Sequence, residues 1–338
     1  MNLPYRIGLL SQLGEYMLSA DPDWVAAKDR AFRENNWFIP EFVESATRNI
    51  AAEFLSKNSL DKWLSDPAYT PLHKELSQPL TIGIVMAGNI PLVGFHDWLS
   101  VFISGNKSLI KPSSRDQALI THLLNKIASW SEEAGAMSSQ AEMLKSCDAY
   151  IATGSNNSSR YFEYYFNRYP HIIRKNRTSA AVLTGNESDS ELEALADDVH
   201  LYFGLGCRNV TKIYVPQQYD FVPLLESFKK YSWMGDHHKY KNNYDYNLAI
   251  HLLNRNFYMT NGSILLIEDP SIFSPISQLN YEYYAQGEDR MEKLTGNPEL
   301  QCLAGKGGIP FGQSQKPELK DYADGVDSLS FLAGLARN

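Results

Sequence analysis

A cysteine that follows two glycines is the first candidate for chemistry in this sequence. The segment GLGCRNV, residues 204–210, places Cys207 directly before an apolar, β-branched run. Glycine allows backbone conformations that other residues avoid, and the neighbouring Arg208 favours the thiolate form of a cysteine. A thiolate presented on such a turn can attack a carbonyl carbon. Most unpaired cysteines are inert apolar residues in a core, and the segment alone slightly favours that interpretation.

An asparagine at the end of an apolar strand is the second candidate. In MAGNIPL, residues 86–92, the strand ends in Gly88-Asn89 and a proline follows. Ligands of open α/β sheets bind beyond the carboxyl ends of the strands. There the Asn89 amide could donate a hydrogen bond to a reacting oxygen, or it could serve only as a helix N-cap.

A basic and hydroxyl-rich segment follows the next strand. In LIKPSS, residues 109–114, Lys111 could contact a nucleotide ribose or phosphate. The small hydroxyls of Ser113 and Ser114 leave room for a 2′-phosphate, with Arg115 as an ion partner. The alternative is an ordinary surface lysine at a strand end.

A Gly-Ser turn follows a third strand and opens a helix. In ATGSNNSSR, residues 152–160, Gly154 and Ser155 precede a helix N-terminus whose backbone N–H groups could bind an anion. The segment is not a GxGxxG fingerprint, which occurs nowhere in the chain. A simple turn is the alternative interpretation.

Alternating strands and helices position these residues. Residues 1–75 are predicted to be mostly helical. The strands that we expect next are 80–87, 106–112 and 148–154, followed by helices at 91–104, 114–130 and 155–169 and by the strands HIIRKN and SAAVLTG. The helix 91–104 should begin with Pro91. This alternation is typical of a parallel, doubly wound sheet.

The second half of the chain has the pattern of another α/β unit. An amphipathic helix from 187 leads to Cys207, and the strand NVTKIYV follows. A helix at about 219–231, a polar aromatic segment at 231–248 and strands near 262–267 complete the pattern.

Composition limits the class of protein. The 338 residues exceed what one hydrophobic core usually holds, which predicts two domains. The net charge of -8 argues against nucleic acid or an anionic membrane surface as a general partner. No stretch approaches the roughly 18 apolar residues that span a bilayer, and the N-terminus lacks the features of a signal peptide.

The cysteines and histidines do not suggest a metal site. Three cysteines without zinc-type spacing fit a reducing cytoplasm, and we interpret Cys147 and Cys302 as structural. The polar segment with His237, His238 and His251 is interpreted as solvated. His96 is interpreted as a helix-packing residue rather than a proton donor, and GKGGIPFG, residues 305–312, as a flexible loop rather than a P-loop.

The order of these features resembles the aldehyde dehydrogenase superfamily. Asparagine follows the first strand, KPSS the second, Gly-Ser the third and LTG the fourth, before the cysteine. GNIPLVGFHDWLSVFISGNKSLIKPSS, NRTSAAVLTG and GLGCRNVTKIYVP are similar to the acyl-CoA reductase branch, the fatty acid reductase component of bacterial luciferase systems. The resemblance covers about residues 80–330 and is most specific around 86–114 and 204–216.

The resemblance implies an α/β, aldehyde-dehydrogenase-like fold with two domains. We expect a helical N-terminal segment and a doubly wound, Rossmann-like NADP-binding domain over 1–182, and an α/β catalytic domain over 183–310. The tail 311–338 should return to the first domain or form an oligomer strand.

The resemblance also implies roles for single residues. Cys207 matches the thiol nucleophile, and Asn89 matches the amide that forms the oxyanion hole with the Cys207 backbone N–H. Lys111 matches a lysine that binds the adenosine ribose, and Ser114 falls where NAD-preferring relatives carry a glutamate. The cofactor-binding residues that we expect are Met86, Lys111, Ser113, Ser114, Arg115, Gly154 and Ser155.

Two departures from the resemblance bear on the reaction. Val182 replaces a glutamate that activates water in aldehyde-oxidising relatives, which favours release of an aldehyde over an acid. Ser271 in SIFSP replaces a second glutamate that holds the nicotinamide ribose.

The function implied is the reduction of a fatty acyl-CoA to its aldehyde, with NADPH preferred over NADH. The alternatives are a reductase of a short or semialdehyde-forming acyl substrate and a non-catalytic binding subunit of the same fold. The expected partners are acyl-CoA and either a second copy, through residues 324–332, or an enzyme that supplies or uses the acyl group.

Overall fold

The structure is a computed structural model that describes residues 1–73, 78–285 and 287–335. The chain forms two compact units. The first unit comprises Met1–Asn176 and the segment from Pro317 onward, and the second comprises Arg177–Lys316. Each unit is built on its own largely parallel sheet.

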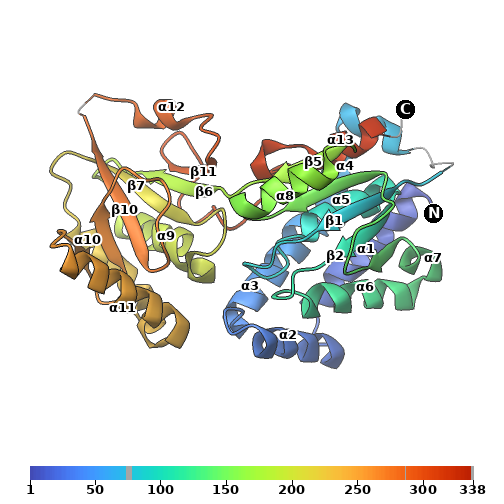
Figure 1. Ribbon diagram of the computed structural model, residues 1–338, viewed down its shortest axis with the longest axis horizontal. Coiled ribbons are helices and arrows are strands. Elements are labelled where there is room, and N and C mark those ends of the chain that lie inside the picture. Colours follow the sequence, from blue (N-terminus) through green and yellow to red (C-terminus); the bar gives the residue numbers. More distant parts are fainter. Residues whose placement is uncertain (74–77, 286, 336–338) are drawn as a thin grey trace. The chain divides into compact units, whose positions relative to one another are not determined.

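The first unit contains a five-stranded parallel sheet in the order β3-β2-β1-β4-β5 (Figure 1). Its strands are β1 (Thr81–Val85), β2 (Lys107–Lys111), β3 (Ser138–Gln140), β4 (Ala149–Thr153) and β5 (His171–Arg174). The order reverses direction after β3, so the sheet is doubly wound as predicted. The carboxyl ends of β2, β1 and β4 lie side by side, because Val85 pairs with both Lys111 and Ala152.

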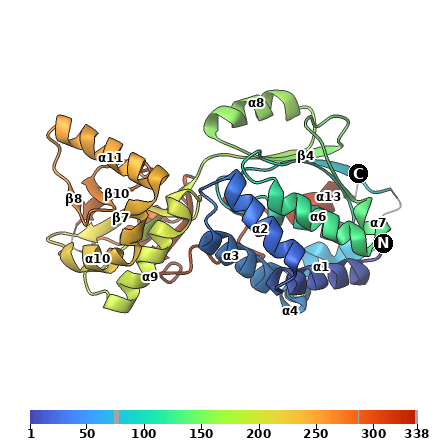
Figure 2. The ribbon, with the colours of Figure 1, turned by 90° about the horizontal axis from the view of Figure 1, so that it is seen from below.

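Helices cover both faces of this sheet. The helices of the first unit are α1 (Leu3–Leu18), α2 (Pro22–Glu34), α3 (Pro40–Asn49), α4 (Lys57–Leu64), α5 (Phe95–Ser104), α6 (Ala118–Trp130), α7 (Glu132–Gly135), α8 (Asn156–Phe166) and α13 (Ser328–Leu335). In Figure 2, α8 lies on one face of the sheet and α6 lies on the other. The predicted helical character of residues 1–75 is confirmed for the described residues by α1–α4 and a 3-10 helix at Pro67–His73, and residues 74 and 75 lie outside the described residues.

The helix predicted from Pro91 begins four residues later, at Phe95. Leu92 has a positive φ of 57°, and its N–H donates to the buried Asp116 carboxylate over 2.6 Å. A residue in the left-handed region does not continue a helix. Residues 91–94 therefore form a turn.

The second unit contains a six-stranded sheet in the order β11-β6-β7-β10-β9-β8. Its strands are β6 (Thr178–Val182), β7 (Val210–Pro216), β8 (Met259–Thr260), β9 (Leu265–Glu268), β10 (Gln278–Tyr284) and β11 (Leu300–Gly305). All of these pairings are parallel except β8 with β9. The strand β6 thus belongs to the second sheet, because it pairs with β7 and β11, which come later in the chain. The domain boundary predicted at residue 182 had placed the residues of β6 in the cofactor domain.

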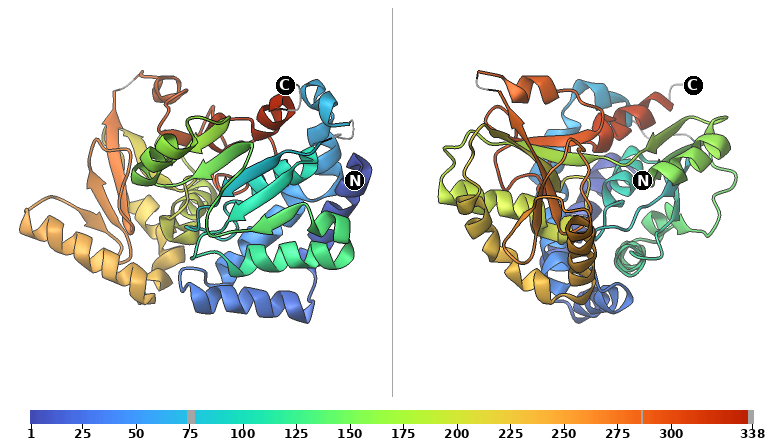
Figure 3. Two further views of the ribbon diagram at one scale, coloured as in Figure 1. Left: turned by 45° about the vertical axis from the view of Figure 1, so that its right-hand side comes forward. Right: turned by 60° about the vertical axis from the view of Figure 1, so that its left-hand side comes forward.

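The helices of the second unit are α9 (Asp189–His200), α10 (Val222–Ser227), α11 (His238–Leu253) and α12 (Arg290–Leu294). Most of the polar aromatic segment 231–248, for which no helix or strand was predicted, lies in a 3-10 stretch and in α11, drawn in orange in Figure 3. Its helical signal is the spacing of the buried residues Tyr240, Tyr244 and Asn247. Tyr244 packs against Leu265 and Ile267 of β9.

The C-terminal segment 324–332, expected to offer an interface strand, forms a turn and the start of α13 instead. Leu329, Leu332 and Ala333 are buried in the core of the first unit. Within the described residues, no helix is both long enough and apolar enough to cross a membrane.

Candidate functional site

The loops after β1 and β2 in the first unit pack directly against each other. The Met86 N–H donates to the Lys111 carbonyl over 3.0 Å. A Cβ on Gly88 would lie 2.6 Å from the Ser113 Cβ, so only glycine allows this approach. The half-buried Asn89 follows directly. The two loops therefore bring the predicted residues Met86, Asn89, Lys111 and Ser113 together at the carboxyl ends of the strands.

A buried carboxylate that the sequence analysis did not single out joins these loops. Asp116 accepts the Leu92 N–H through Oδ2, and its own N–H donates to the Ser113 carbonyl over 3.0 Å. Burial raises the pKa of Asp116 to about 7, although the hydrogen bond from the Leu92 N–H partly opposes this shift. Its Oδ1 is buried and has no hydrogen-bond partner among the described residues. The only sequence signal was an acidic residue directly after the predicted cofactor segment.

The predicted cofactor side chains of the second loop point to solvent. Lys111, Ser114 and Arg115 are exposed. The backbone beneath them is held, because the Ser113 hydroxyl accepts the Arg115 N–H over 3.2 Å and the Asn35 amide donates to the Arg115 carbonyl over 3.2 Å. The loop thus presents a cation and small hydroxyls on a fixed backbone.

The Gly-Ser turn after β4 opens α8. Ser155 is the N-cap, and its hydroxyl accepts the Ser158 N–H over 3.3 Å. A Cβ on Gly154 would lie 2.9 Å from the Ser158 Cβ and 2.8 Å from the Phe162 ring, so glycine is required for the helix to pack here. This helix N-terminus lies at the same sheet edge as the two loops. Exposed N–H groups at a helix N-terminus suit an anionic ligand.

In the second unit, Cys207 lies on a turn before the amino end of β7. Its side chain is half-buried. The Cys207 carbonyl accepts the Ser179 hydroxyl over 3.0 Å, and the Asn209 N–H donates to the Gly206 carbonyl over 3.1 Å. The Asn209 side chain accepts the Gly206 N–H over 2.8 Å. Neither Ser179 nor Asn209 was among the candidates predicted from the sequence.

The chain reaches this turn through an unusual backbone path. Tyr202, Phe203 and Gly204 have successive φ angles of 56°, 57° and 74°. Such values are costly for aromatic residues and persist only where packing enforces them. Phe203 is buried, and its ring centroid lies 4.4 Å from that of His237. Packing of Phe203 therefore helps to fix the approach to Cys207.

A second buried carboxylate lies beneath the turn. Asp198, on α9, accepts the Gly312 N–H over 2.7 Å and the Ser314 hydroxyl over 2.6 Å. The Arg208 guanidinium donates to the Ser314 carbonyl over 3.3 Å. Burial raises the pKa of Asp198, although the hydrogen bonds from Gly312 and Ser314 oppose the shift. The segment after β11 is thereby tied to both α9 and the cysteine turn.

The other two cysteines have environments that keep them protonated. Burial raises the pKa of the Cys302 thiol to about 11 and also raises that of Cys147. Cys302 Sγ lies 2.9 Å from the Ser179 hydroxyl oxygen. A thiol is far less nucleophilic than a thiolate, so burial makes both residues poor nucleophiles.

The structure overturns the interpretation of Val182. Val182 ends β6 and pairs with Tyr214, whereas Cys207 precedes the amino end of the parallel strand β7. Val210 and Tyr214 are four residue steps apart along β7, or about 13 Å. Val182 packs in a core cluster with Tyr214. It therefore does not occupy the position of a water-activating base beside Cys207.

Ser271, the second departure, lies in the loop between β9 and β10. Its hydroxyl donates to the Phe273 carbonyl over 2.9 Å. The Thr211 hydroxyl donates to the Ile272 carbonyl over 2.7 Å, which holds this loop against the start of β7. The Ser271 loop thus lies beside the strand that follows Cys207.

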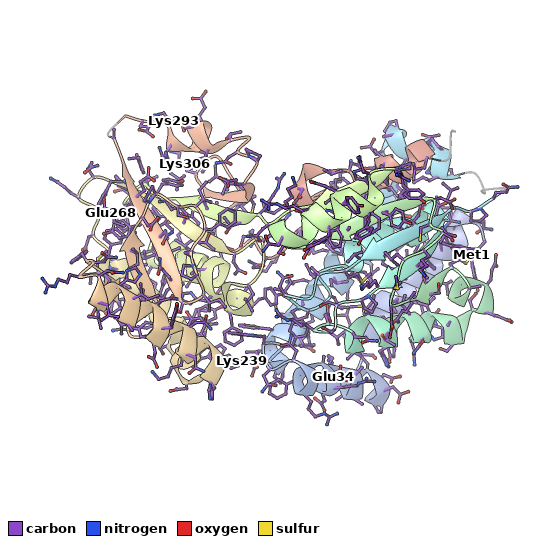
Figure 4. The ribbon with its side chains drawn as sticks, viewed as in Figure 1. Met1, Glu34, Lys239, Glu268, Lys293 and Lys306 are labelled. Atoms are coloured by element: carbon purple, nitrogen blue, oxygen red, sulfur yellow. The ribbon has the colours of Figure 1, made fainter. Side chains whose placement is uncertain are left out.

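A cavity of about 420 Å³ opens at the other end of the second sheet. Its lining residues include Thr184 after β6, Glu191 on α9 and Lys306, which is labelled in Figure 4. Glu191 is already engaged in a capping box with Ser188. Residues of the GKGGIPFG segment form one wall of this cavity. The cavity lies at the carboxyl ends of the strands, whereas Cys207 lies at their amino ends.

The remaining candidates have packing roles. His96 bonds to the Leu319 carbonyl over 3.0 Å, and its ring packs against Phe54, Trp63 and Tyr322, which confirms the helix-packing interpretation. His237 caps α11, and His251 bonds to the Gln278 amide over 3.0 Å. The described part of the chain holds no group of three side chains arranged to bind a metal ion.

Solved structures with the same fold define the class of the molecule. The aldehyde dehydrogenase 21 of Physcomitrella patens, solved with succinate, superposes with a TM-score of 0.63 at 13% identity, covering 90% of this chain and 74% of that one. An NADP-dependent enzyme of Escherichia coli gives 0.66 at 11% identity, covering 90% and 73%. An aldehyde dehydrogenase of Mycobacterium tuberculosis complexed with NAD+ gives 0.63 at 12% identity, covering 86% and 70%. The fold is therefore that of the aldehyde dehydrogenase superfamily.

A family model narrows this class. The model of the acyl-CoA reductase (LuxC) family matches residues 42–224, more than half of the 338 residues. No curated protein sequence matches the chain. The chain belongs to the acyl-CoA reductase (LuxC) family, and the protein is an oxidoreductase of that family.

Proposed function

We propose that this protein reduces a fatty acyl-CoA thioester to the aldehyde, with NADPH, through a thioacyl intermediate on Cys207. The observation that carries the proposal is the extent of the family match. Residues 42–224 include Cys207, Asn89 and every predicted cofactor residue. The first unit is assigned cofactor binding, and the second unit is assigned the nucleophile.

The residues of the first unit fit a dinucleotide. Lys111, Ser114 and the N-terminus of α8 lie at the carboxyl edge of a doubly wound sheet, where such folds bind nucleotides. Lys111 would contact the adenosine ribose, and the turn at Gly154 and Ser155 would approach the pyrophosphate. The small Ser114 leaves room for a 2′-phosphate, which favours NADPH. The cofactor, when bound, supplies the hydride that reduces the thioester.

The protein residues do the acyl transfer. The Cys207 thiolate attacks the thioester carbonyl carbon, and the carbonyl π electrons move to oxygen. The Asn89 amide and the Cys207 backbone N–H donate hydrogen bonds to this oxyanion. The carbon–sulfur bond to CoA then breaks, and CoA leaves as a thiolate that takes a proton from solvent. After hydride transfer, the tetrahedral adduct releases the aldehyde and returns the thiolate to Cys207.

The test is a spectrophotometric assay with a series of acyl-CoA chain lengths and with NADPH or NADH. We expect oxidation of NADPH to depend on a long-chain acyl-CoA and to yield aldehyde and free CoA in equal amounts. Cys207→Ala should abolish turnover, whereas Cys147→Ala, which removes a buried cysteine of the first unit, should retain it. An unchanged rate in Cys207→Ala would rule out a thioacyl intermediate on Cys207.

Two other results would redirect the proposal. Turnover confined to short acyl-CoA substrates would identify a short-chain reductase. No turnover with any acyl-CoA, in a protein that binds NADPH, would identify a non-catalytic binding subunit.

A further inference from the structure

The carbonyl groups on both sides of Cys207 are held by hydrogen bonds. The Gly206 carbonyl accepts the Asn209 N–H over 3.1 Å, and the Cys207 carbonyl accepts the Ser179 hydroxyl over 3.0 Å. The Gly206 N–H is also held, because it donates to Asn209 Oδ1 over 2.8 Å. Rotation of either peptide group would break at least one of these bonds.

Asn209 connects this turn to the end of α9. Its side chain is fully buried. The amide nitrogen donates to the carbonyls of Asp198, Val199 and Leu201 over 3.1, 3.3 and 2.8 Å. These carbonyls belong to the last turn of a helix, where backbone acceptors lack intrahelical partners. The amide thus has bonds at both its oxygen and its nitrogen, which fixes its orientation.

Ser179 connects the turn to the sheet. It is fully buried at the amino end of β6. The Cys302 N–H donates to the Ser179 oxygen over 3.2 Å, and Cys302 Sγ lies 2.9 Å from the same atom. Burial keeps Cys302 protonated, so its S–H is a donor to Ser179. The Ser179 proton is then directed to the Cys207 carbonyl, because both lone pairs of its oxygen are engaged.

We propose that Asn209 and Ser179 are positioning residues for Cys207, which orient its thiol and its backbone N–H toward the acyl carbonyl. This proposal rests on the proposed role of Cys207 as the nucleophile. Covalent attack requires the reacting atoms to be aligned to within a fraction of an ångström. Fully bonded, buried polar groups define one geometry more sharply than apolar packing does. The two residues act through Cys207 and do not themselves react.

The experiment compares Asn209→Asp and Ser179→Ala with a matched control, Asn247→Ala. Asn209→Asp keeps the side-chain shape and the acceptor for Gly206, but loses the amide donors to α9. Asn247 is a buried asparagine of the same unit whose amide donates to the Ile276 carbonyl over 2.8 Å, away from the cysteine turn. Thermal unfolding establishes that each variant is folded at the assay temperature.

Two measurements separate positioning from stability. The first measurement is kcat and KM for a long-chain acyl-CoA. The second is the pH profile of Cys207 alkylation by iodoacetamide in the absence of substrate, which peptide mass spectrometry detects. We expect kcat to fall about tenfold or more in both variants, with KM changed by less than about twofold. The midpoint of Cys207 alkylation should shift in both, whereas Asn247→Ala should lower only the melting temperature. Ser179→Thr, which keeps the hydroxyl, should restore most of kcat.

The proposal is overturned if both variants keep the wild-type kcat and alkylation midpoint while losing as much thermal stability as Asn247→Ala. Asn209 and Ser179 would then be structural residues only. Failure of the proposed function is a distinct outcome, since either Cys207→Ala would retain the wild-type turnover or the wild type itself would show none. The alkylation profile does not depend on acyl-CoA and still reports whether the two residues set the state of Cys207.

Discussion

The loops of the first unit and the cysteine turn of the second hold their candidate residues in opposite ways. Lys111, Ser114 and Arg115 are exposed on a loop whose backbone is held by other residues. Cys207 is half-buried, and fully buried side chains bond the peptide groups around it. The first arrangement separates the side chains that are predicted to bind a ligand from the contacts that hold the fold.

This difference determines which substitutions each region tolerates. Exposed loop residues can be exchanged with little effect on packing, so substitutions in this loop should leave the first unit folded. Around Cys207, a buried donor or acceptor that loses its partner costs about 1–3 kcal/mol. The turn is therefore expected to tolerate little change, and its substitutions should affect both stability and rate.

The two regions also differ in the chemistry of their anchors. Asp116, which joins the first-unit loops, is ionisable and has a pKa raised to about 7 by burial. Asn209, which holds the cysteine turn, is a neutral amide. Only the first anchor should respond to pH.

The largest expected effect outside Cys207 itself is that of Asn89→Ala. Loss of one oxyanion donor typically costs roughly 3–4 kcal/mol, so turnover should slow about a hundredfold or more without unfolding. Steady-state kinetics with acyl-CoA and NADPH, beside circular dichroism, measures both. Asn89→Asp, which keeps the shape but adds negative charge, should be at least as slow. A decrease of less than about threefold in either variant would remove Asn89 from the oxyanion site.

Cofactor preference should change next most strongly. Ser114→Glu places a carboxylate where a 2′-phosphate is expected, and the repulsion should raise KM for NADPH about tenfold or more. KM for NADH should change little or fall. Thermal stability should stay the same, because Ser114 is exposed. Equal effects on both cofactors would contradict the assignment of Ser114 to the 2′ position.

A smaller effect, on stability, is expected from Asp116→Asn. The pKa of Asp116 is about 7 in the folded protein and ordinarily 3.8. Between these values the folded state binds a proton that the unfolded state has released, so this residue makes stability fall as pH rises from about 4 to 7. The asparagine keeps an acceptor for the Leu92 N–H and has no such dependence.

The measurement is the melting temperature of wild type and Asp116→Asn at several pH values. The melting temperature of the variant should rise relative to that of the wild type from about pH 4 up to pH 7, and the difference between them should be constant above pH 7. A difference independent of pH would show that Asp116 titrates normally.

The smallest effect is expected from Cys302→Ala. The substitution removes the S–H donor to Ser179 but leaves the Ser179 hydroxyl and its bond to Cys207 in place. Turnover should fall by only about twofold, consistent with the modest strength of a thiol donor. Loss of most activity would instead assign Cys302 a direct part in the reaction.

Much of the first sheet could be predicted from the sequence, because its signals are local. Apolar runs that end in Gly88, Lys111 and Gly154 mark three strands and their carboxyl ends. The start of α5 could not be predicted from Pro91, because Asp116, distant in sequence, holds the Leu92 N–H. The helix α11 was missed because its buried face consists of tyrosines and an asparagine rather than aliphatic residues.

The candidate site divides in the same way. The sequence by itself determined Cys207, Asn89 and the cofactor segment as candidates, since residue type and order along the chain carry that information. Tertiary structure alone decided that Val182 is a core residue at the far end of a strand, and that Ser179 and Asn209 hold the cysteine turn. The physical reason is that hydrogen bonds between segments distant in sequence leave no periodicity or spacing in the sequence to indicate them.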